Sequence, residues 1–212
     1  MTDDEALARF EALMRSQQPP SEPWSPVTDF SFVARQSVEG KHPELIWQHL
    51  IGYDDADVLD YGCGPDGHLV RLLREYQMAH QPQSQVCLTG YDPQADESNP
   101  YLRRTEPRRD RYDLVVCREV VEHCPIREVV RIVRKLCALS SRLVYLTTRH
   151  PKHPEHFLSV DTSDDLDPDH RTMLAQPFLR LLFVLEGFKR RADLEAILDW
   201  KQLGRVLIYE RG

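Results

Sequence analysis

The sequence lacks the features that mark secreted and membrane-spanning proteins. Its five cysteines are odd in number and form no C-x-x-C pair, which indicates reduced, mostly packed thiols and a cytoplasmic protein. The first residues are acidic rather than basic, so we expect no signal peptide. The longest apolar stretch, 178–188, is interrupted by Arg180 and Glu186 and is too short to span a bilayer.

The chain also has no excess of positive charge. Its net charge is −7 and its isoelectric point is about 5.7. Non-specific affinity for nucleic acid comes mainly from neutralising phosphates, so general nucleic-acid binding is not expected, although a local basic site stays open. A hydrophobic content of 41% in 212 residues is ordinary for a globular protein and predicts one domain with a sizeable core.

The N-terminal region differs from the rest of the chain. Residues 4–16 have the apolar spacing of a short amphipathic helix, and residues 17–26 hold four prolines and two serines. We expect residues 1–40 to form a cap, and residues 41–212 to form the main domain, starting with a short helix over 42–51.

Apolar strand-like runs alternate with helical patterns over the main domain. This order predicts right-handed β-α-β units and a doubly wound, mostly parallel α/β sheet. The last strand is expected to form an antiparallel hairpin with residues near 189–198. The strands are predicted at 58–61, 85–91, 112–117, 142–148 and 205–210, and the main helices at 67–78, from Pro125 onwards, and at 176–186.

The most informative stretch runs from Val58 to Gly67. A buried strand ends there in an acid and turns through glycines into a helix, where open α/β sheets bind their ligands. The glycines fit the dinucleotide pattern G-x-G-x-x-G, so a nicotinamide-binding protein is one interpretation. Asp60 favours another, because a carboxylate beside the turn repels a pyrophosphate and attracts a cationic ligand such as S-adenosylmethionine.

Several motifs in order give the chain a family resemblance. It resembles the class I S-adenosylmethionine-dependent methyltransferases, which have a Rossmann-like domain and a sheet of seven-stranded type. In this chain the third strand is weak, because residues 93–111 are polar and rich in arginine. The matching segments are LDYGCGPDG (59–67), YDP (91–93), YDLVVCREVVEH (112–123), LVYLTTRHP (143–151), FLRLLFVLEGF (178–188) and RVLIYE (205–210).

The resemblance implies a set of cofactor contacts. The glycine turn is expected to cradle the amino-acid portion of S-adenosylmethionine, with Asp60 near its ammonium group. The acid after the second strand is expected to accept the ribose hydroxyls, as in nucleotide-binding α/β folds. The implied cofactor-binding residues are Asp60, Gly62, Cys63, Gly64, Gly67, Asp92, Cys117 and Arg118.

Histidines supply the candidates for acid–base chemistry. His123, His150 and His170 follow strand ends or lie in the long loop before the last helix, and imidazole titrates near neutral pH. A second interpretation is a metal site. A family of small-RNA 3′-terminal 2′-O-methyltransferases resembles this chain here, with an E-x-x-E-H set and a distant histidine as ligands. The corresponding residues are Glu119, Glu122, His123 and His170.

The sequence therefore predicts a methyltransferase that acts on a small molecule or biosynthetic intermediate. One alternative is a metal-assisted RNA 2′-O-methyltransferase. The other is a cofactor-binding partner or regulator without transfer activity.

Overall fold

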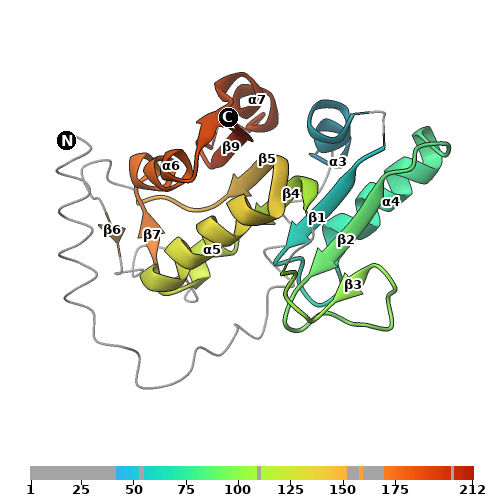
Figure 1. Ribbon diagram of the computed structural model, residues 1–212, viewed down its shortest axis with the longest axis horizontal. Coiled ribbons are helices and arrows are strands. Elements are labelled where there is room, and N and C mark those ends of the chain that lie inside the picture. The colour runs from blue at the N-terminus through green and yellow to red at the C-terminus, as the bar shows by residue number, and fades with distance from the viewer. Residues whose placement is uncertain (1–41, 53–54, 109–110, 152–157, 160–169, 202) are drawn as a thin grey trace.

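The computed structural model describes residues 42–52, 55–108, 111–151, 158–159, 170–201 and 203–212 (Figure 1). The predicted N-terminal helix and the linker lie outside the described residues, so the cap stays an expectation. Within the described residues, no helix is long and apolar enough to cross a membrane.

A seven-stranded sheet organises the molecule, in the order β3-β2-β1-β4-β5-β9-β8. The first five of these strands pair in parallel, and β9 is inserted antiparallel between β5 and β8. This arrangement confirms the predicted mostly parallel sheet with a terminal antiparallel hairpin. The strands are β1 (Asp57–Tyr61), β2 (Cys87–Tyr91), β3 (Leu102–Arg103), β4 (Tyr112–Arg118), β5 (Ser140–Thr147), β8 (Phe188–Arg190) and β9 (Val206–Arg211).

Helices cover both faces of this sheet (Figure 1). One face packs against α3 (His42–Ile46), its π-helical continuation η1 (Trp47–Ile51), α4 (His68–His80) and α7 (Ala192–Leu198). The other packs against α5 (Ile126–Leu139) and α6 (Gln176–Leu185). Because both faces of the central strands are buried, β4 and β5 read as continuous apolar runs rather than as alternating ones.

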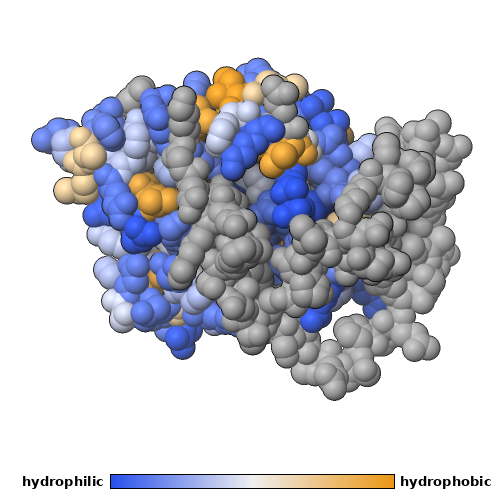
Figure 2. All heavy atoms as spheres, turned by 180° about the vertical axis from the view of Figure 1, so that it is seen from behind, coloured by the Kyte–Doolittle hydropathy of each residue, from blue (hydrophilic) through white to orange (hydrophobic). Residues whose placement is uncertain are grey.

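Short elements complete the fold. A 3-10 turn, η2 (Val121–His123), follows β4, and β6 (Leu158–Ser159) pairs with β7 (Met173–Leu174) as a separate two-stranded sheet. Figure 2 shows the face opposite to that of Figure 1, where hydrophilic side chains predominate and hydrophobic ones form separate small groups.

Two local predictions need correction. The hairpin partner was expected over 189–198, but only Phe188–Arg190 is a strand, and Ala192–Leu198 is a helix. Its helical spacing buries Leu194 and Leu198, while Glu195 accepts hydrogen bonds from Arg190 Nε and from the Ile208 amide. Pro125 is the N-cap residue of α5 rather than its first helical residue.

Candidate active site

The carboxyl ends of β1, β2, β4 and β5 meet at one edge of the sheet. The chain order reverses between β1 and β4, and ligands of open α/β sheets bind at such a switch point. The glycine turn, Asp92 and the E-x-x-E-H segment all lie at this edge, because each follows one of these strands.

Gly62 fits the turn after β1 because only glycine can occupy its position. Its φ is 83°, and a Cβ there would lie 2.4 Å from Cγ2 of Val120. The amides of Gly62 and Cys63 both donate to the Tyr91 carbonyl, at 2.7 and 3.0 Å. The turn therefore packs against the end of β2 and against Val120, in the segment that follows β4.

The next glycines continue this close approach. Gly67, the N-cap of α4, has φ 57°, and a Cβ there would lie 2.4 Å from Cδ2 of Leu102. Gly64 is different, because a Cβ there would meet only Asp66 Oδ1, at 3.8 Å. Gly64 thus presents bare backbone beside open space, and its amide donates to Asp92 Oδ2 at 3.2 Å.

Two buried carboxyl groups, Asp60 and Asp92, lie on this edge. Burial raises the pKa of Asp60 to about 7; the positive charge of Arg118 opposes the rise and the negative charge of Asp92 adds to it. Burial also raises the pKa of Asp92, against hydrogen bonds from the amides of Gln94 and Gly64. An acidic site whose charge is poorly compensated favours a ligand that carries positive charge and hydroxyl donors.

The predicted cysteine contacts are limited by burial. The Cys63 thiol is buried and donates to the Gly64 carbonyl at 3.3 Å, and Cys117 lies entirely inside the core beneath α5. Burial raises the pKa of both thiols, so neither is a thiolate near neutral pH. Only their backbone is left to meet a ligand.

A pocket opens between the ends of β1 and β2 and the helix α5. Its walls combine tyrosine rings with aliphatic side chains, and its lining is Tyr61, Gly62, Tyr91, Asp92, Pro93, Val120, His123, Cys124, Glu128, Arg131 and Ile132. The rings of Tyr61 and Tyr91 lie 4.9 Å apart at a tilt of 54°. This lining can hold a flat ring beside the polar group Asp92.

A cluster of buried polar side chains lies behind the pocket. Atoms of Glu122, His123 and His170 that can bind a metal lie within 4.8 Å of one another. The backbone explains the convergence, because the amides of Arg171 and Thr172 donate to the Glu122 carbonyl at 2.7 and 2.9 Å. Three of the four predicted metal ligands are therefore brought together from two distant segments.

Glu122 is the most buried residue of this cluster. Its Oε2 accepts from the Thr148 hydroxyl at 2.9 Å, and its Oε1 has no hydrogen-bond partner among the described residues. Burial and the neighbouring Glu119 raise its pKa well above the usual value. A bound cation would relieve both effects.

Glu119, the fourth predicted ligand, has an unusual backbone. Its φ of 50° is the one positive value at a non-glycine residue in the described part of the chain. Its carboxylate lies 3.7 Å from Arg149 Nε. Strained backbone held by its surroundings is common at functional sites.

His150 does not belong to the group formed by Glu122, His123 and His170. Its Nδ1 donates to the Leu174 carbonyl at 2.8 Å, and its Nε2 has no hydrogen-bond partner among the described residues. Burial lowers the pKa of His150. The ring is therefore neutral near pH 7 and carries its lone pair on Nε2, as a general base requires.

Sequence reasoning missed the residues of α5 that line the pocket. Glu128 and Arg131 lie three residues apart, between the apolar residues of this helix. Their pattern in the sequence is that of ordinary solvent-facing charges, although both line the pocket. The sequence could have indicated the two tyrosines of the lining. Tyr61 and Tyr91 directly precede Gly62 and Asp92, and they are the last residues of β1 and β2, the strands that lead into the site.

Comparison with known proteins agrees with this geometry. A family model described as a methyltransferase domain matches residues 32–190. No curated protein matches the chain in sequence.

Solved structures show the same fold at low sequence identity. One is magnesium protoporphyrin IX methyltransferase from Synechocystis PCC 6803 with bound S-adenosylhomocysteine, at 16% identity and a TM-score of 0.55, covering 99% of this chain and 96% of that one. Another is 1,6-didemethyltoxoflavin-N1-methyltransferase from Burkholderia thailandensis, at 14% identity and a TM-score of 0.52, covering 91% and 93%.

A third solved structure is an S-adenosylmethionine-dependent methyltransferase from Mesorhizobium loti. It is 14% identical with a TM-score of 0.51, and the match covers 79% of this chain and 98% of that one. With the family match over most of its length, the chain belongs to the class I S-adenosylmethionine-dependent methyltransferases, enzymes whose cofactor is S-adenosyl-L-methionine.

Proposed function

We propose that this enzyme methylates a hydroxyl group of a small-molecule acceptor in the cytoplasm. The observation that carries the proposal is the neutral imidazole of His150, which follows β5 at the edge of the sheet where the glycine turn lies and whose buried Nε2 has no hydrogen-bond partner among the described residues. Two similar structures are named as methyltransferases of small molecules, a magnesium porphyrin and a toxoflavin precursor. The free cysteines of the described chain support a reducing compartment.

The cofactor contacts follow from the site as described. The residues fit S-adenosylmethionine, since Gly64 offers open backbone and the two acids offer negative charge. Asp92 would accept the ribose hydroxyls and Asp60 would attract the ammonium group, with the neighbouring glycine turn and the ends of β1 and β4 around them. When bound, S-adenosylmethionine supplies an electrophilic methyl group on sulfur.

The reaction needs little from the protein beyond alignment and removal of one proton. The acceptor oxygen would take the methyl group that bound S-adenosylmethionine supplies, and the electrons of the sulfur–carbon bond would stay on sulfur. The hydroxyl proton moves to an imidazole nitrogen, and His150, His123 and His170 are the candidates. We favour His150, because the Leu174 carbonyl fixes its tautomer.

The second candidate function is metal-assisted 2′-O-methylation at an RNA 3′ end. The convergence of Glu122, His123 and His170 favours it, with Glu119 as the fourth expected ligand. Mixed carboxylate and imidazole ligands suit Mn²⁺ moderately well. A bound divalent ion would supply Lewis-acid chemistry at the acceptor hydroxyl. The net charge of −7 counts against broad RNA affinity. No feature of the described residues favours a regulator without transfer activity.

The first prediction concerns the charge of Asp60. Its pKa is about 7 in the free protein, and only the ionised form attracts the ammonium of S-adenosylhomocysteine. Affinity for this ligand should therefore rise between pH 5.5 and 7.5, with release of a proton on binding. Titration calorimetry in buffers of different ionisation enthalpy measures both quantities.

The control for this prediction is Asp60→Asn, which removes the titration and keeps the shape. It should bind more weakly and lose the pH dependence. A pH dependence that persists in Asp60→Asn would show that another group is responsible.

The second prediction tests the proposed base. With an acceptor identified by screening, His150→Ala should lower kcat by about 10²–10⁴-fold, the usual contribution of a general base. Because the pKa of His150 is lowered, the acidic limb of the wild-type kcat profile should fall below pH 6.5. Methyl transfer from radiolabelled S-adenosylmethionine is the measurement.

Histidine-to-alanine changes at positions 123 and 170 are the matched comparisons. Unchanged turnover in all three variants would mean that none of these imidazoles takes the proton. The proposal that the acceptor is a hydroxyl group would then be contradicted.

The third prediction separates the two candidate functions. If the cluster binds a metal, Mn²⁺ should raise the melting temperature of the wild type and leave that of Glu122→Gln unchanged, because ligands stabilise the state that binds them. Calorimetric titration with Mn²⁺ and transfer to an RNA oligonucleotide 3′ end complete the test. Absence of any Mn²⁺ effect in the folded wild type would rule out the metal-assisted function.

A further inference from the structure

The connection between β3 and β4 is too short to contain a covering helix. β3 ends at Arg103 and β4 begins at Tyr112, so residues 104–111 make the whole crossover. Parallel strands are usually joined by a dozen or more residues that include a helix. This crossover must also pass β2 and β1, roughly 14 Å at the usual strand spacing. Its described residues form neither helix nor strand.

The crossover runs over the face of the sheet that α5 covers. The Tyr61 hydroxyl donates to Glu106, and Tyr61 belongs to the core cluster beneath α5. Without a helix here, this face of β2 is only partly covered. Tyr91 is half-buried and Cys87 is exposed. The pocket beside Asp92 is lined by the ends of β1 and β2 and by α5, and Glu106 contacts two of its lining residues, Tyr61 and Arg131.

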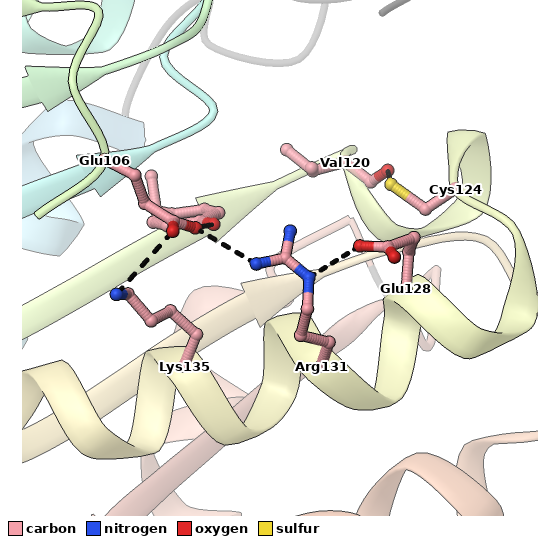
Figure 3. Close-up of polar contacts among 7 residues, drawn as sticks. Glu106, Val120, Cys124, Glu128, Arg131 and Lys135 are labelled. Atoms are coloured by element: carbon pink, nitrogen blue, oxygen red, sulfur yellow. Dashed lines mark hydrogen bonds and ion pairs between the residues drawn. The ribbon is translucent and has the colours of Figure 1, made fainter. Parts of the chain in front are cut away.

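Glu106 fastens the crossover to both walls of the pocket. Figure 3 shows its carboxylate between the side chains of Arg131 and Lys135 on α5. Its oxygens lie 3.6 Å from Arg131 Nη1 and 3.7 Å from Lys135 Nζ. Arg131 Nε also donates to Glu128 at 2.6 Å, so the pocket-lining end of α5 belongs to the same network.

The contacts of Glu106 lead directly to the proposed cofactor residues. Tyr61 precedes Gly62 and its ring contacts that of Tyr91, which precedes Asp92. The Tyr91 carbonyl accepts from the glycine turn. A shift of the Tyr61 side chain would therefore displace both the glycine turn that follows it and Tyr91, the residue before Asp92.

We infer that Glu106 is a positioning residue for cofactor binding, which holds Tyr61 and Arg131 as the two walls of the adenosyl side of the pocket. The inference rests on the proposed cofactor site. In this role Glu106 does not touch the cofactor. Its contacts hold Tyr61 and Arg131 in place, as a packed helix in the crossover would do. The ion pairs of Glu106 are partly exposed to solvent, and ion pairs in contact with solvent add little to stability. The effect of Glu106 should therefore appear in affinity more than in unfolding.

The test is calorimetric titration of the full chain with S-adenosylhomocysteine. Glu106→Gln should raise the dissociation constant about tenfold, equal to about 1.4 kcal/mol. Tyr61→Phe should have a similar effect. The double variant should bind more weakly than either single one, because the two changes remove different contacts of Glu106. Glu106→Gln removes the ion pairs to α5 but leaves an amide oxygen that can accept from Tyr61, and Tyr61→Phe removes that hydrogen bond. Melting curves show that each variant is folded.

The matched control is Glu186→Gln. Glu186 pairs with another arginine of α5, Arg134, at 3.2 Å and with similar exposure, but neither residue lines the pocket. This control should bind like the wild type. Equal affinity of Glu106→Gln and wild type, or equal loss in Glu186→Gln, would overturn the inference. If Glu106→Gln does not fold, Tyr61→Phe decides. Failure of the wild type to bind would instead refute the cofactor site on which the inference rests.

Discussion

The site depends on the contact between the glycine turn and the end of β2. Two consecutive amides, of Gly62 and Cys63, donate to one carbonyl, that of Tyr91. This contact requires a positive φ and no side chain at Gly62, because Val120 occupies the space that a Cβ would need. Strands β1, β2 and β4 are thereby held together at one edge, and the acids at their ends become neighbours.

The same arrangement concentrates negative charge in a poorly solvated place. Asp60, Asp92 and Glu122 are all buried, and burial raises the pKa of each. Such groups weaken the free protein above the pH at which the unfolded chain ionises, since the unfolded state then binds fewer protons. Two of these acids have a positive ligand in the proposals above: the ammonium group at Asp60, and a metal ion in the second candidate function at Glu122.

Much of the fold could be predicted from the sequence. Glycine spacing, apolar runs and the terminal pattern gave the mostly parallel sheet, the weak third strand and the antiparallel last strand, all of which the structure confirms. The error at 192–198 arose because a seven-residue segment with Leu194 and Leu198 also fits a short strand region. In the structure this segment is a helix that buries Leu194 and Leu198, and Glu195 accepts from the Ile208 amide of β9, a contact that the local pattern does not reveal.

The site was harder to predict than the fold because its contacts join distant segments. Local spacing placed Glu119, Glu122 and His123 near one another. The hydrogen bonds that bring His170 beside them run from a segment about fifty residues away. The role of Glu106 was equally invisible, since a lone glutamate in a polar, arginine-rich stretch has no distinguishing pattern. The shortness of the crossover is what gives that residue its importance.

The most direct measurement is binding of S-adenosylhomocysteine to the wild-type protein in the presence and absence of NADH. The account predicts one site with micromolar affinity that NADH does not affect, because the acids beside the glycine turn repel a pyrophosphate. Displacement by NADH, or no binding by folded protein, would contradict the account.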